Sequence, residues 1–217
     1  MALGLIGKKL GMTQVYTAAG ELVPVTVIQA GPCTVVQAKS AATDGYAAVQ
    51  VGFGAKKPQR ATKAYREHCV KVGKGVFQTL REFRLEDGAP ALAPGDEVAV
   101  AALFKEGDAV DITGVTKGRG YTGVIKRHGF GGFPGSHGTH EYFRHGGSIG
   151  NRSFPGRVFK NKRMAGQYGN DRVTTQNIEI IAVRPDEHLL LVRGAVPGAR
   201  GGVVVVRPAV KAKKKHG

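Results

Sequence analysis

Short apolar segments separated by Gly- and Pro-containing turns dominate the hydrophobic pattern of the chain. Valine and small apolar residues fill these segments, as is typical of β-strands. Their spacing of roughly ten residues predicts a mainly β protein, built as a small antiparallel barrel or sandwich. The predicted strands are Leu22–Gln29, Thr34–Ala38, Tyr46–Phe53, Glu97–Leu103, Ile178–Val183, Leu189–Val192 and Val203–Val206.

One stretch in the first half has a helical composition instead. Pro58–Val72 begins with proline, which is favoured in the first turn of a helix. We therefore expect a small helical insertion near residues 58–72, with its short helix near Thr62–Val72. Leu85–Gly95 is predicted to be a loop.

Residues 113–172 show neither the short apolar segments of strands nor the repeating pattern of a helix. They hold 15 of the 33 glycines, 14 of them after Gly114, and eleven Lys and Arg residues oppose only Glu141 and Asp171. An irregular run of this length inside a compact domain is usually functional or disordered. Its aromatic and aliphatic residues argue against disorder, so we expect an extended arm that becomes ordered on its partner.

Charge identifies the kind of partner. The chain has 32 Lys and Arg against 16 Asp and Glu, a net charge of +16 and a pI of about 10.1. Residues 1–110 carry a net charge of +3, whereas residues 111–217 carry +13. A field this positive and this uneven indicates a polyanionic ligand bound by the second half.

Cysteine content and hydropathy indicate the cellular compartment in which the protein is expected. Cys33 and Cys69 have no metal-type spacing, which favours a reducing compartment. The N-terminus does not resemble a signal peptide, and no apolar window approaches the ~18 residues of a membrane span. We therefore expect a cytoplasmic protein with no membrane contact.

The arm contains one formal cofactor pattern, since Gly118, Gly120 and Gly123 match G-x-G-x-x-G. A dinucleotide site needs this pattern between a strand and a long helix. A strand is available before it at Ala109–Thr113, but no helix of useful length follows. Glu141 lies at the expected separation for the ribose-binding acid, yet it does not end a strand. We interpret these glycines as positions of close backbone approach to a ligand.

Catalytic and metal chemistry are also disfavoured. His137 and His140 are three residues apart, but no cysteine and only one carboxylate accompanies them. No G-x-S-x-G elbow or carboxylate pair occurs. We therefore expect no enzyme activity, no cofactor and no metal.

Basic side chains, glycines and aromatic residues together favour nucleic acid. Lys and Arg neutralise phosphates, and glycine lets the backbone approach sugar and phosphate closely. No basic helix that could enter a DNA major groove is present, so folded RNA is the better match. A nucleotide-dependent enzyme and an architectural DNA-binding protein are the alternatives; binding of NAD or ATP, or a preference for duplex DNA, would identify them.

At this point the sequence resembles a known family. Phe104–Arg127, read FKEGDAVDITGVTKGRGYTGVIKR, is similar to the signature of the large-subunit ribosomal protein L three family in bacteria. The resemblance covers nearly the whole chain. Further matching segments are Gly4–Tyr16, Pro24–Cys33, Asp44–Phe53, Gly147–Thr174 and Leu189–Gly198.

The resemblance implies a structural constituent of the large ribosomal subunit. It implies a translation-factor-like antiparallel β-barrel and a long central extension that runs through ribosomal RNA toward the peptidyl-transferase centre. It also implies direct binding of large-subunit ribosomal RNA early in assembly, with ribosomal proteins L fourteen and L nineteen as neighbours. Some members carry a methylated Gln after the Gly-Ser-Ile-Gly element, but Asn151, Arg152 and Ser153 occupy those positions here.

Three regions and a set of contact residues follow. Residues 1–115 and 173–209 form the globular barrel domain, 116–172 the RNA-threading arm, and 210–217 a basic tail. The residues expected to bind RNA are Lys117, Arg119, Lys126, Arg127, His128, His137, His140, Arg144, His145, Arg152, Arg157, Lys160, Lys162 and Arg163. The glycines expected at close approach are Gly118, Gly120, Gly123, Gly147, Gly150 and Gly156.

Overall fold

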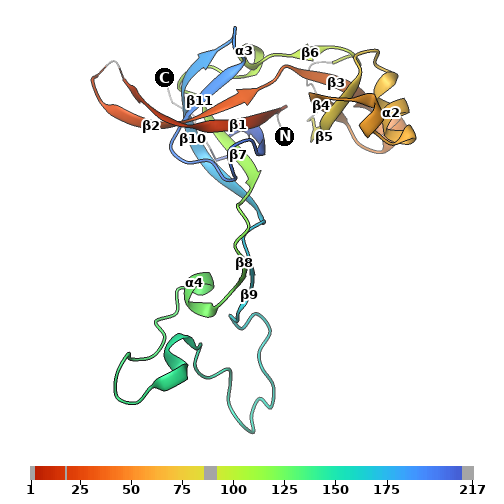
Figure 1. Cartoon of the computed structure of the whole chain (residues 1–217). Coiled ribbons are helices and arrows are strands. Elements are labelled where there is room, and N and C mark those ends of the chain that lie inside the picture. The colour runs from red at the N-terminus through yellow and green to blue at the C-terminus, as the bar shows by residue number, and fades with distance from the viewer. Residues whose placement is uncertain (1–2, 18, 86–91, 212–217) are drawn as a thin grey trace. The chain divides into compact units, whose positions relative to one another are not determined.

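The computed structural model describes residues 3–17, 19–85 and 92–211 (Figure 1). The chain forms two compact units: the body, residues 1–115 and 172–217, and the arm, residues 116–171. The prediction of a mainly β protein is confirmed. Part of the loop predicted at Leu85–Gly95 and most of the predicted tail lie outside the described residues.

Six strands of the body pair into a closed antiparallel barrel in the order β1-β12-β7-β10-β11-β2. Closure gives every strand of this sheet a neighbour on both sides. The alternation of strand side chains explains which residues face the core: in β12, Val204 and Val206 are buried, whereas Val203 and Val205 are not. The barrel strands are β1 (Leu5–Tyr16), β2 (Leu22–Ala30), β7 (Ala109–Val115), β10 (Arg172–Arg184), β11 (Leu189–Arg193) and β12 (Val203–Pro208).

A second antiparallel sheet of the body has the order β5-β4-β3-β6. Its strands are β3 (Cys33–Lys39), β4 (Ala48–Lys56), β5 (Val76–Arg84) and β6 (Glu97–Val98). Short helical segments connect or flank these strands: α1 (Ala41–Asp44), η1 (Pro58–Arg60), α2 (Lys63–Val70) and α3 (Val100–Leu103).

One hydrophobic core joins the two sheets of the body. Ile28 and Ile112 of the barrel belong to the same buried cluster as Val51 and Phe83 of the second sheet. Packing within that sheet is close enough to require glycine at Gly52, where a Cβ atom would overlap the ring of Phe77. The body therefore positions strands of both sheets against one another as a single packed unit.

The arm contains little regular structure. Strand β8 (Gly120–Thr122) pairs with β9 (Gly166–Tyr168), and between them lie the helix α4 (Val124–His128) and the 3-10 segment η2 (His140–Arg144). Helix α4 ends at Gly129, whose φ of 73° is the left-handed geometry of a C-cap. The other described residues of the arm are turns and irregular chain (Figure 1).

The sequence predictions of single elements differ from the structure in several places, and the short strands β8 and β9 were not predicted. The strand predicted over Glu97–Leu103 is wrong after Val98. Strand β6 ends there, and the short helix α3 follows with Val100 buried in the core. The pattern did not predict β1 or β5, whose polar and charged residues mask their alternation. The helix expected near Thr62–Val72 is α2, and Pro58 starts the separate turn η1.

Every helix in the described part of the chain falls short of the length and apolar character needed to cross a bilayer.

Candidate nucleic-acid interface

The arm presents many cations and almost no acids. Its 56 residues include ten Lys and Arg, opposed by Glu141 and Asp171 alone. Nine of these ten cations are exposed, and no ion pair among the described residues involves any of the ten. Cations without carboxylate partners remain available to phosphates. Arg172, which the sequence grouped with the arm, is instead the first residue of β10 in the body.

The two chain segments that open and close the arm are held by backbone hydrogen bonds. The N–H of Thr116 donates to the carbonyl of Asp171 over 2.9 Å, and the N–H of Arg119 donates to that of Tyr168 over 2.8 Å. The guanidinium of Arg119 lies 4.8 Å from the centre of the Tyr168 ring. Gly169, at φ 71°, leaves no room for a Cβ atom beside the Lys117 carbonyl. The strand pair β8–β9 is thus the ordered base of the arm.

The glycine pattern in this base does not have the geometry of a dinucleotide site. The five-residue α4 follows it, and β8 pairs with an antiparallel neighbour rather than within a βαβ unit. Gly120 requires glycine for its φ of 67°. At Gly118 the nearest atom to a Cβ would be 3.7 Å away, and at Gly123 nothing lies within 4 Å. The fold of the chain alone therefore gives no steric reason for glycine at these last two positions.

Arg127 and His128 have partners inside the arm that the sequence did not predict. Nη1 of Arg127 donates to the carbonyl oxygen of Met164 over 2.7 Å, and Nε2 of His128 lies 3.0 Å from the same oxygen. A Cβ atom at Gly166 would lie 2.6 Å from Nη1 of Arg127, so glycine makes room for the guanidinium. Both side chains are half-buried and hold α4 against the chain before β9.

The other histidines of the arm, His137, His140 and His145, are exposed. His137 and His140 occupy left-handed backbone positions, with φ 58° and 48°. The ring of His145 packs at 4.7 Å from that of Tyr142. Within the described ranges no group of three His, Cys, Asp or Glu side chains could hold a metal ion.

Exposed aromatic rings alternate with cations in residues 152–163. Phe154 is 88% exposed and Phe159 is 60% exposed, and the guanidinium of Arg157 lies 6.0 Å from the Phe159 ring centre. The remaining predicted contacts in this stretch, Arg152, Lys160, Lys162 and Arg163, are exposed as well. An aromatic face beside a guanidinium can stack a base while the cation binds its phosphate.

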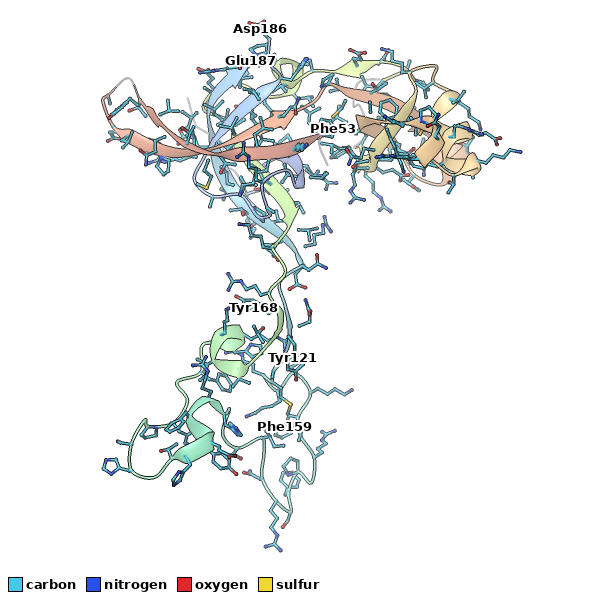
Figure 2. All side chains as sticks on the ribbon, viewed as in Figure 1. Phe53, Tyr121, Phe159, Tyr168, Asp186 and Glu187 are labelled. Atoms are coloured by element: carbon cyan, nitrogen blue, oxygen red, sulfur yellow. The ribbon has the colours of Figure 1, made fainter. Side chains whose placement is uncertain are left out.

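Further features of the arm became evident only in three dimensions. Tyr121 of β8 is 78% exposed, and Figure 2 shows it in the arm with Tyr168 and Phe159. Exposed aromatic residues on a short strand give a weak signal in sequence, because the same residues commonly form cores.

Gly147 and Gly156 have φ of 74° and 66° and so need glycine for backbone geometry, whereas a Cβ at Gly150 would lie 3.7 Å from the nearest atom.

A mainly β body with a basic, acid-poor and largely irregular arm is typical of structural proteins that bind a polyanion. The model of the family Ribosomal protein L3 matches residues 89–188. The large ribosomal subunit protein uL3 of Trichlorobacter lovleyi is 52% identical, over 99% of this chain and 100% of its own length. Those of Herpetosiphon aurantiacus and Syntrophobacter fumaroxidans are 49% and 48% identical, over 99% and 98% of this chain and the whole of theirs.

The chain belongs to the ribosomal protein L3 family. Proteins of this family are structural proteins of the large ribosomal subunit and are not enzymes.

Proposed function

We propose that this chain binds large-subunit ribosomal RNA directly and that the arm is its main RNA-contacting unit. The observation that carries the proposal is the set of ten cations in the arm, none of which has an ion-pair partner among the described residues. Exposed aromatic residues interleave with them, and the irregular backbone offers its polar groups to a ligand. Membership of the family supports RNA as the polyanion.

The body has a separate part in this proposal. Residues 1–115 and 173–209 form a translation-factor-like barrel domain that anchors the protein on the cytoplasmic ribosome. The arm reaches RNA near the peptidyl-transferase centre and supports it without taking part in chemistry. Early binding of this kind nucleates assembly, and ribosomal proteins L fourteen and L nineteen are the expected neighbours. The tail, residues 210–217, adds further phosphate contacts.

The proposed contact residues differ in their freedom to reach RNA. Arg127 and His128 combine RNA contact with their hydrogen bonds to Met164, so their loss changes the arm itself. Arg152, Arg157 and Lys160 are exposed, and their side chains form no hydrogen bond or ion pair with any described residue. These three are therefore the cleanest positions at which to test phosphate binding.

The test is the salt dependence of binding to large-subunit ribosomal RNA. The variant with Arg152, Arg157 and Lys160 changed to Ala is compared with one in which Lys63, Arg184 and Arg193 are changed to Ala. The control cations already lie 4.0, 3.7 and 3.2 Å from carboxylates. Each lost phosphate contact lowers the log–log slope by about 0.7–0.9. We expect a flatter slope for the arm variant only; equal slopes in all three proteins would refute the assignment.

A further inference from the structure

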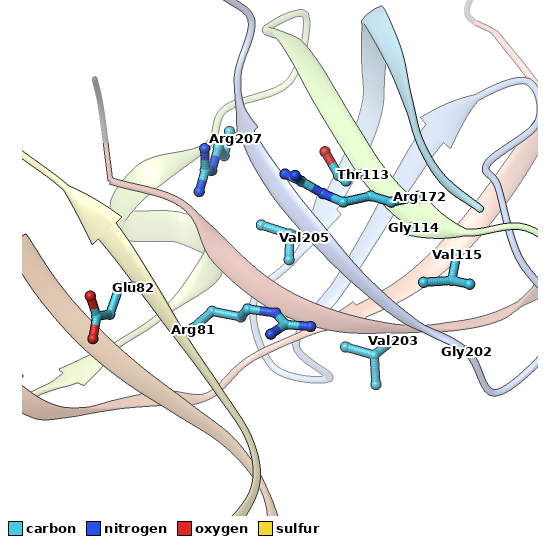
Figure 3. A pocket seen from close by; sticks show the side chains of 10 residues that line it. All are labelled: Arg81, Glu82, Thr113, Gly114, Val115, Arg172, Gly202, Val203, Val205 and Arg207. Carbon is cyan, nitrogen blue, oxygen red and sulfur yellow. The ribbon is translucent and has the colours of Figure 1, made fainter. Parts of the chain in front are cut away.

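A pocket of about 510 Å³ in the body is lined by three arginines from three different strands (Figure 3). Arg81 comes from β5 of the second sheet, whereas Arg172 and Arg207 come from β10 and β12 of the barrel. Their side chains surround Val205 in Figure 3. This cluster could not be predicted from the sequence, because its members are distant along the chain and share no basic run.

Among the residues that the structure describes, the pocket has no carboxylate available to neutralise these cations. No ion pair among the described residues involves any of the three arginines. Glu82, the one acidic residue of the lining, is already occupied: one oxygen lies 2.8 Å from Nζ of Lys39, and the other accepts from the Tyr46 hydroxyl over 2.9 Å. Figure 3 shows its carboxylate turned away from Arg81.

Arg207 is held in an environment that disfavours its charge. Its guanidinium lies 4.9 Å from the ring centre of Phe83, and its buried Nε has no hydrogen-bond partner in the described part of the chain. Burial lowers the pKa of Arg207, and the nearby charge of Arg172 lowers it further. An anion in the pocket would offset the repulsion between the two guanidinium groups and would favour the charged form of Arg207.

The lining also has an apolar part that narrows the choice of anion. Val115 is 50% exposed and Val203 is 36% exposed, and both lie in the wall with Val205. A sugar–phosphate backbone presents phosphate oxygens next to the apolar edge of a ribose, which matches arginines beside exposed valines. A carboxylate and a phosphodiester can each accept from a guanidinium fork, so the ribose beside the phosphate is the feature that fits the exposed valines.

We propose that Arg81, Arg172 and Arg207 form an RNA phosphate-binding site on the body, in addition to the contacts of the arm. The site takes a backbone phosphate, with the ribose against the valines. Its ligand class rests on the proposed function, but the residues and their geometry belong to the body alone.

The test uses the full chain and large-subunit ribosomal RNA. The double variant R81Q/R172Q removes two exposed cations, and R184Q/R193Q, which removes two ion-paired arginines of β10 and β11, is the matched control. The triple variant with R207Q is measured beside them, with circular dichroism as a check because Arg207 also packs on Phe83. We expect the log–log salt slope to fall by at least about 0.7 in the double variant and not in the control.

The outcomes separate this site from the function of the arm. If the wild type binds the RNA but R81Q/R172Q keeps the slope of its control, the pocket does not hold an RNA phosphate and the proposal is overturned. If the wild type itself fails to bind, the proposed function fails first. Titration with inorganic phosphate and with poly-glutamate identifies the anion. Pocket-dependent binding of poly-glutamate without a change in the RNA slope would mean a protein-docking site and would also overturn the proposal.

Discussion

The buried carboxylate of Asp111 in β7 connects this strand to β10 and to the chain after β12 by hydrogen bonds. Its Oδ1 accepts the N–H of Asn177 over 2.9 Å, where the register of β10 against β7 shifts, and its Oδ2 accepts the N–H of Val210 over 3.3 Å. Only 7% of the residue is exposed. A carboxylate that satisfies two backbone donors at a bulge is difficult to replace, because each unpaired buried group carries a desolvation penalty.

Replacing Asp111 with Ala should destabilise the protein by roughly 1–3 kcal/mol, since two backbone N–H groups would lose their acceptor. Urea unfolding followed by circular dichroism measures the change. Asp186→Ala, at an exposed position in the turn after β10, is the control and should be close to wild type. Equal stability of the two variants would contradict the structural role of Asp111.

Substitutions at two glycines of the arm can test contact with RNA without disturbing the fold. A Cβ atom at Gly118 or Gly150 would meet its nearest neighbour at an ordinary 3.7 Å, and neither has positive φ. Gly118→Ala and Gly150→Ala should therefore leave stability within about 0.5 kcal/mol of wild type. If RNA backbone approaches these glycines closely, both should bind large-subunit ribosomal RNA more weakly in filter binding. Unchanged affinity would show that these positions do not touch RNA.

At the scale of elements, the second sheet carries a polar network that depends on pH. The carboxylate of Glu82 accepts from Lys39, Tyr46 and Gln50, and Gln50 in turn bonds to His68. The hydrogen bond and charge of Lys39 lower the pKa of Glu82 below its ordinary value. A carboxyl with a lowered folded pKa stabilises the fold above its unfolded pKa of about 4.3, and this stabilisation is lost as pH falls.

Glu82→Gln should therefore flatten the acid side of the stability profile. The wild type should lose stability more steeply than the variant as pH falls from about 5 to about 3, because Glu82 must be protonated only in the wild type. Chemical unfolding at each pH measures this. Glu21→Gln, at an exposed position before β2, should keep the wild-type slope. A parallel profile for Glu82→Gln and wild type would contradict the network.

Elements with strong local patterns could be predicted, and those shaped by neighbours could not. The valine runs gave β2, β11 and β12 closely, because alternation and turns coincide there. β1 contains Gly7 and Gly11 among lysines, and it is a strand because β2 and β12 pair with it. The charge of the arm was readable from composition. The bonds of Arg127 and His128 to Met164, and the pocket of Arg81, Arg172 and Arg207, join residues far apart in sequence and needed the fold.

The two units of the whole molecule differ in what stabilises them. The body has a core shared by two sheets, whereas most residues of the arm are exposed and few have regular structure. Replacing residues 127–163 with a short Gly-Ser linker should therefore leave a folded body, since no residue of that span belongs to the body. Circular dichroism should retain its strand signal and a cooperative melt. An unfolded variant would show that the body depends on the arm.

The most direct measurement of the central claim is the occupancy of large ribosomal subunits after a high-salt wash. The full chain, the variant lacking residues 127–163 and the control with Lys63, Arg184 and Arg193 changed to Ala are each expressed as the sole copy, and subunits are quantified by mass spectrometry. If the arm is the main RNA contact, the full chain and the control remain bound while the shortened chain is lost or its subunits fail to mature. Retention of the shortened chain at full-chain occupancy, in mature subunits, would contradict the account.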